Sequence, residues 1–193
     1  SVYMVRNELD SIRLQKILDS LRWFTLFGET YINSSKEGET ADKIRTLALP
    51  KLLYALMLPD ENECTTAMYA LQNYLNNALK TTSGFWGTFK PDGSGYHHYG
   101  PYFSAYYPDA LYASCFLFYL LKDTPFALND EVYDNLKKAL LSFRFLCGEY
   151  NVPGALTGRF PSQANILQQL IPAYAYLALC KQDDEILATL KKL

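Results

Sequence analysis

Three kinds of side chain that can move or stabilise a proton occur in two irregular parts of this chain. His97 and His98 are adjacent and are its two histidines, and tyrosines surround them. Histidine beside tyrosine can transfer protons. Arg159 lies in the second irregular segment, residues 148–161, where a guanidinium can bind a carboxylate through two parallel hydrogen bonds. This set suits removal of the weakly acidic proton beside a carboxylate, because fixed positive groups stabilise the developing charge. On a uronic acid, that step would lead to β-elimination of the O4 substituent.

The histidines lie in residues 85–107, FWGTFKPDGSGYHHYGPYFSAYY. Glycines and prolines prevent a regular helix in this stretch, and helical patterns flank it. Long loops within helical domains are either disordered or functional. Disordered segments carry few aromatic residues and much charge, whereas this stretch holds nine aromatic residues. We therefore expect an ordered loop with a function.

Composition and motifs exclude several classes of protein. The net charge of −2 gives no basic field for nucleic acid or anionic membranes. The longest apolar run, residues 110–121, is too short to span a bilayer. The four cysteines form no CxxC pair and lie in apolar helical patterns, so we expect buried thiols and no transition-metal centre. The loops hold no close carboxylate pair, which disfavours a glycoside hydrolase.

Hydrophobic periodicity predicts an all-α domain built from antiparallel helical hairpins. No strand pattern of useful length appears. The spacing of the apolar residues and the positions of capping residues and prolines predict helices at about 11–27, 40–58, 61–80, 108–121, 129–147, 162–180 and 183–193. The helices at 61, 129 and 183 should be capped by Asp60, Asn129 and Asp183, Gly28 should cap the end of the first helix, and Pro50 should kink or restart the second. The helix at 108–121 is apolar nearly all round, so it should be buried on most sides.

Four motifs together resemble the chondroitin sulfate ABC lyases of polysaccharide lyase family 8. They are KPDGSGYHHYGPY (90–102), LLKDTPF (120–126), NLKKA (135–139) and LTGRFP (156–161), in the same order and at nearly the same spacing as in that family. The similarity covers most of the chain and is weaker before residue 81.

The resemblance implies a role for each of three residues. His98 matches the catalytic histidine after the PDG motif, and Arg159 matches the arginine of the family's GR segment. Without a gap, the catalytic tyrosine falls on Ala105, which cannot act as a base. The spacing to the DTP motif implies one extra residue and selects Tyr106, which we prefer. The spacing in hyaluronate- and chondroitin-AC-type relatives selects Tyr107, which stays open.

The resemblance also suggests substrate contacts. Trp86, Tyr99 and Tyr102 are candidate sugar-stacking rings, and loop packing is the alternative for each of them. His97 and Tyr107 complete the set of expected substrate-binding residues. His97 replaces an arginine of the ABC-type sequences and Tyr99 replaces a glutamate, so the preferred substrate can differ.

The family implies an incomplete α/α toroid followed by β-sandwich domains. Residues 1–193 would be the C-terminal part of that toroid, and a further catalytic glutamate would lie beyond Leu193. The expected complete protein is a secreted or periplasmic, monomeric enzyme that acts on sulfated glycosaminoglycans. It would need no cofactor, although Ca²⁺ or Mg²⁺ could bind, and the isolated chain would be inactive.

Two other functions fit the same helical scaffold. The first is a non-catalytic glycan-binding module, which would bind sugar without elimination. The second is a helical protein-interaction scaffold, which would carry a contiguous apolar face away from the loops.

Overall fold

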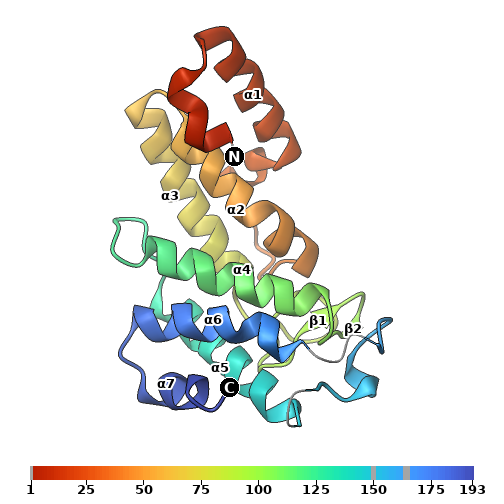
Figure 1. The fold of residues 1–193 in the computed structure, drawn as a ribbon. Coiled ribbons are helices and arrows are strands. Elements are labelled where there is room, and N and C mark those ends of the chain that lie inside the picture. Colours follow the sequence, from red (N-terminus) through yellow and green to blue (C-terminus); the bar gives the residue numbers. More distant parts are fainter. Residues whose placement is uncertain (1, 149–150, 163–165) are drawn as a thin grey trace.

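A computed structural model describes residues 2–148, 151–162 and 166–193, and these form an all-α structure, as predicted (Figure 1). A tiny antiparallel sheet of two short strands interrupts the helices. The α-helices are α1 (Ser11–Phe24), α2 (Ala41–Met57), α3 (Glu61–Ala78), α4 (Tyr106–Leu121), α5 (Asp130–Leu146), α6 (Leu167–Cys180) and α7 (Asp184–Leu190); the strands are β1 (Tyr96–His97) and β2 (Gly100–Pro101); the 3-10 turns are η1 (Val2–Glu8), η2 (Phe27–Tyr31) and η3 (Gly154–Leu156).

Side-chain caps fix the starts of five helices. In each case a side-chain oxygen accepts a hydrogen bond from a backbone N–H of the first turn, which would otherwise lack a partner. The predicted caps of α3, α5 and α7 are confirmed. The capping residues are Asp10, Thr40, Asp60, Asn129 and Asp183.

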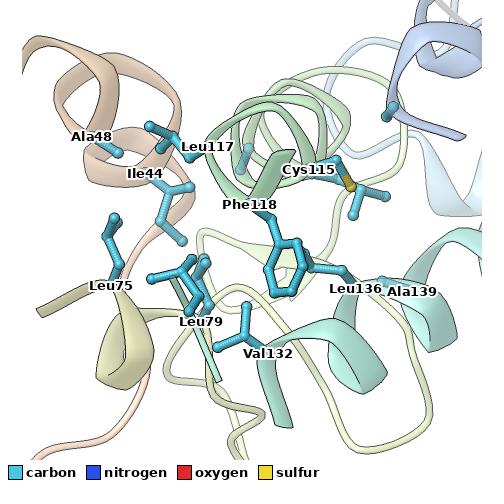
Figure 2. Packing of buried hydrophobic residues seen from close by; sticks show 14 of the residues in the cluster. Ile44, Ala48, Leu75, Leu79, Cys115, Leu117, Phe118, Val132, Leu136 and Ala139 are labelled. Atoms are coloured by element: carbon cyan, nitrogen blue, oxygen red, sulfur yellow. The ribbon is translucent and has the colours of Figure 1, made fainter. Parts of the chain in front are cut away.

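The helices stack in hairpins around one continuous apolar core. α2 and α3 form an antiparallel pair, while α4 lies across α2 and runs beside α6 in the same direction (Figure 1). Figure 2 shows Ile44 of α2 and Leu75 of α3 to the left of Phe118, Leu136 of α5 to its right and Val132 of α5 below it. The nearly all-apolar α4 is therefore buried on several sides, as its sequence predicted.

Three prolines lie inside helices without ending them, Pro50 in α2, Pro108 in α4 and Pro172 in α6. α2 continues through Pro50, where the sequence predicted a kink or a restart. α4 begins at Tyr106 and not at Pro108, so Pro108 occupies the first turn, where its missing N–H costs no helical hydrogen bond. This earlier start makes Tyr106 and Tyr107 helical residues.

Two further predicted boundaries were wrong. α1 ends at Phe24, and Gly28 lies in η2 instead of capping the helix. α6 begins at Leu167, whereas Ser162 lies in a turn. Part of the segment between Ser162 and Leu167, residues 163–165, lies outside the described residues.

The described helices include none long and apolar enough to cross a membrane. All four cysteines are free thiols; two are buried and two are partly buried. Within the described ranges, no three His, Cys, Asp or Glu side chains come together as a metal site.

Lys51 of α2 is a fully buried lysine whose ammonium donates to the Leu26 carbonyl at 2.8 Å. Burial lowers its pKa from 10.5 to about 8, against the opposing charge of Glu29. Between these two values the unfolded chain binds a proton that the folded chain does not. The Lys51 contribution to the free energy of unfolding therefore increases as the pH rises from about 8 to 10.5 and is lost as the pH falls back from 10.5 to about 8.

We expect Lys51→Met to remove this pH dependence. The difference in unfolding free energy between the native chain and the variant should change in favour of the native chain by up to about 3 kcal/mol between pH 8 and 10.5. Urea unfolding of both proteins under reducing conditions measures this difference. Tyrosines and thiols titrate equally in the two proteins, so their contributions cancel when one free energy is subtracted from the other. A free-energy difference that stays constant between pH 8 and 10.5 would contradict the lowered pKa of Lys51.

Candidate active site

The β1–β2 hairpin presents His98 and Tyr99 at its tip. His97 pairs with Gly100, so His98 and Tyr99 form a two-residue turn. Their φ angles are 50° and 65°, as in the type I′ turn that suits a tight hairpin. Left-handed backbone is unfavourable for a bulky tyrosine. Both side chains are exposed, and Tyr99 retains 76% of its accessible surface, so the strained turn points these two rings into solvent beside α4.

Tyr106, in the first turn of α4, is the centre of the site. Arg159 Nη2 donates to its hydroxyl oxygen at 2.5 Å. The His97 ring stacks on the Tyr106 ring, with centroids 4.1 Å apart and planes inclined at 23°. The His98 ring meets Tyr106 edge to face at a centroid distance of 5.8 Å. The structure thus brings together the three residues predicted to be catalytic.

Arg159 reaches Tyr106 because the second irregular segment is bonded to the first. The Phe103 N–H donates to the Leu156 carbonyl at 2.8 Å, and the Ser104 hydroxyl donates to the Thr157 carbonyl. Figure 1 shows this segment beside the hairpin and the start of α4.

Gly158 makes a close approach possible next to Arg159. Its φ is +64°, and a Cβ atom there would lie 2.5 Å from the Tyr102 ring. Only glycine fits both the backbone conformation and this space.

A charged network from α2 also contacts the Tyr106 ring. The Arg45 guanidinium carbon lies 4.5 Å from the centroid of the Tyr106 ring. Arg45 donates to Asp42 at 2.9 and 3.0 Å and lies 3.6 Å from the Asp109 carboxylate. The Tyr106 ring therefore has two guanidinium groups within 6 Å of its centroid, Arg45 and Arg159.

His97 is a buried neighbour of this network. Its side chain is 6% exposed, and Nε2 lies 3.6 Å from Asp42. That nitrogen has no hydrogen-bond partner among the described residues. Burial is the main cause that lowers the His97 pKa, and the neighbouring His98 adds to it, while Asp42 opposes it. At neutral pH we therefore expect an uncharged His97. Because His97 is buried and His98 is exposed, His98 is the histidine that can reach a substrate.

Two of the expected substrate-binding tyrosines are core residues. Tyr107 is fully buried, and its hydroxyl donates to the Gly93 carbonyl at 3.0 Å. Burial raises the Tyr107 pKa well above its usual value. Tyr102 is 4% exposed and lies beneath Gly158. Neither ring can stack on a sugar, so we remove both from the expected contacts and no longer consider Tyr107 as the base.

Trp86 and Tyr99 line a hollow of about 240 Å³ next to the histidines. The Trp86 indole N–H donates to the Glu37 carbonyl at 2.9 Å, so the ring is fixed in place. The Lys36 ammonium lies 3.1 Å from its ring centroid. These two aromatic residues therefore remain candidates for substrate contact.

Sequence reasoning missed Asp42, Arg45 and Asp109. Asp42 and Arg45 are three residues apart on α2, which in a sequence resembles any solvated ion pair on a helix surface. Only the packing of α2 against α4 places them beside Tyr106, so no local signal could identify them.

Comparison with known proteins agrees with the family resemblance of the sequence motifs. A family model described as "Lyase, catalytic" matches residues 1–189. The Chondroitin sulfate ABC exolyase of Proteus vulgaris is 31% identical over 86% of this chain, and that of Bacteroides thetaiotaomicron is 27% identical over the same share. The Chondroitin sulfate ABC endolyase of Proteus vulgaris is 29% identical over 98% of the chain. These alignments cover 16%, 16% and 19% of the respective relatives, so the chain spans less than a fifth of their length. The family match over residues 1–189 shows that this chain belongs to the lyase catalytic domain family.

Proposed function

We propose that this chain is the C-terminal part of the helical domain of a lyase that cleaves uronic-acid-containing glycosaminoglycans of the chondroitin and dermatan sulfate type. The observation that carries the proposal is the contact between Arg159 and the Tyr106 hydroxyl, with His98 beside them. The similarity to chondroitin sulfate ABC lyases supports the substrate class.

Tyr106 is the proposed general base. Its oxygen accepts from Arg159, which stabilises the phenolate. The phenolate removes the C5 proton of the uronate, and the electrons of that C–H bond form the C4–C5 double bond. The C4–O4 bond breaks, and O4 takes the bonding electrons and a proton. The Tyr106 hydroxyl formed in the first step can supply that proton.

Arg159 and His98 are the proposed stabilisers of the uronate carboxylate. Neutralising the carboxylate acidifies the C5 proton and stabilises the enolate-like charge that develops when it leaves. His98 is exposed at the hairpin tip, and it can also act as the base for the opposite C5 epimer.

The proposed complete enzyme needs residues outside this chain, because the chain spans less than a fifth of its curated relatives. We therefore expect the isolated 193-residue chain to release no unsaturated uronate. The complete polypeptide that contains it should release this product from both chondroitin sulfate and dermatan sulfate.

The ultraviolet absorbance of the unsaturated product tests this proposal. Release of unsaturated uronate by the complete polypeptide would support the proposed lyase function. Binding of either polysaccharide without product, unchanged by His98→Ala, would instead identify a glycan-binding module.

A further inference from the structure

α4 begins without the kind of side-chain cap that fixes the starts of five other helices. Ala105 precedes it and offers no side-chain hydrogen bond to the first turn. Backbone N–H groups that lack a partner at a helix start allow the first turn to open. Tyr106 is the first residue of this turn. The position of the proposed base therefore depends on contacts that come from outside α4.

Arg45 of α2 provides two such contacts. It projects from a helix start that is itself fixed, because Thr40 caps α2. The Arg45 guanidinium carbon lies 4.5 Å from the centroid of the Tyr106 ring, which is within the range of a cation–π interaction. Its Nη1 lies 3.6 Å from the carboxylate of Asp109, which is also in the first turn of α4. One side chain of α2 thus holds this turn at two points.

Every guanidinium nitrogen of Arg45 faces a carboxylate of the protein. Nε and Nη2 both donate to Asp42 Oδ1, at 3.0 and 2.9 Å, and Nη1 faces Asp109. Binding of a substrate carboxylate by an arginine uses two parallel N–H groups, and Arg45 has no such pair free. Arg159 differs, because its Nη2 donates to the Tyr106 hydroxyl. The contacts of Arg45 suit support of Tyr106 rather than binding of the uronate.

Asp42 connects Arg45 to a second neighbour of the same ring. Its Oδ1 accepts from Arg45, and its Oδ2 lies 3.6 Å from His97 Nε2. The His97 ring stacks on Tyr106 with a centroid distance of 4.1 Å. One carboxylate therefore orders two of the side chains that contact the Tyr106 ring.

We propose that Arg45 is a positioning residue, which holds the Tyr106 hydroxyl beside Arg159 during elimination. The inference rests on the proposed function, because it requires Tyr106 as the base. Misplacing a reacting group by about 1 Å can reduce a rate by about a hundredfold. Without Arg45 the base is still present, but it occupies the reactive position less often.

Arg45→Met in the complete polypeptide tests this role. We expect kcat for unsaturated uronate release to fall by about three- to thirtyfold, with KM unchanged within about threefold. The assay contains about 0.15 M salt, which screens charges over about 8 Å. The half-exposed carboxylates of Asp42 and Asp109 then repel the substrate little when Arg45 is absent. A loss confined to KM would show that Arg45 acts on substrate binding and would overturn the proposal.

Arg13→Met is the matched control. Arg13 forms a similar pair with Asp10, three residues away along the chain, but at the start of α1. Its replacement should change neither kcat nor KM. A loss equal to that of Arg45→Met would contradict a specific role for Arg45.

A double-mutant cycle with Tyr106→Phe separates positioning from a general disturbance of the structure. When the hydroxyl is absent, Arg45 has no base to position. Arg45→Met should therefore change the residual kcat of the Tyr106→Phe enzyme by less than about twofold. An equal fold loss in both backgrounds would overturn the positioning role.

Asp109→Asn decides the question if Arg45→Met does not fold, which urea unfolding of the 193-residue chain detects. This variant keeps the bonds between Arg45 and Asp42 and removes only the ion pair between α2 and α4. Its kcat should fall by about two- to fivefold, as expected for one partly exposed ion pair. An unchanged kcat would then overturn the inference and leave the lyase function in place. Absence of product from the unmutated polypeptide would instead overturn the function itself.

Discussion

Tyr106→Phe should reduce the rate of unsaturated uronate release by the complete polypeptide by about a hundred- to ten-thousandfold, the usual contribution of a positioned general base. The substitution removes only the hydroxyl oxygen that accepts from Arg159. The phenylalanine ring can still stack on His97 and lie below Arg45. Stability should therefore change little, and the loss should appear in kcat. The ultraviolet assay on chondroitin and dermatan sulfates measures it.

Tyr107→Phe is the matched control for this experiment. It is the same substitution one residue along α4, at the tyrosine that the alternative spacing selects. The Tyr107 hydroxyl bonds to the buried Gly93 carbonyl, so its removal should cost about 1 kcal/mol of stability and leave kcat within a few fold. Equal activity of Tyr106→Phe and the unmutated enzyme would exclude Tyr106 as the base. A severe loss in Tyr107→Phe alone would transfer the role to Tyr107.

The choice between these two tyrosines shows what the sequence could and could not decide. Apolar periodicity and capping residues predicted most of the helices, because those signals act within a few residues. The orientation of adjacent residues depends on where a helix starts. Pro108 suggested a start two residues too late, so the sequence could favour Tyr106 over Tyr107 only through motif spacing and left Tyr107 open. In the structure both belong to the first turn of α4, where Tyr106 faces Arg159 and Tyr107 faces the core.

Contacts between segments that lie far apart in the sequence were the second feature that sequence patterns could not predict. His98 and Arg159 could be proposed from their motifs, but their approach to Tyr106 depends on the bonds between residues 103–104 and 156–157. Arg45 had no motif at all, and its place over Tyr106 follows from how α2 packs on α4. Such contacts arise from tertiary packing, which hydrophobic periodicity does not encode.

Gly95→Ala should destabilise the chain by about 3 kcal/mol or more, at the upper end of the range for overpacking a core. Gly95 lies against the Tyr107 ring, and a Cβ atom there would be 2.0 Å from two ring carbons. Tyr107 cannot move away easily, because Phe103 packs against its ring at 5.2 Å and Gly93 holds its hydroxyl. The Gly95 carbonyl also accepts from the Tyr102 N–H, so a shift of the loop would disturb the hairpin. Urea unfolding of the 193-residue chain measures the loss.

Gly100→Ala is the control, because a Cβ atom at this hairpin position would meet nothing within 4 Å. It should change the free energy of unfolding by less than about 0.5 kcal/mol. Equal stability of the two variants would show that Tyr107 is not the rigid anchor of the loop. If Gly95→Ala is as costly as expected, the aromatic loop depends on one buried tyrosine for its shape. Its neighbour Tyr106 is then held toward Arg159 by the packing of Tyr107, because a rigid first turn of α4 connects the two residues.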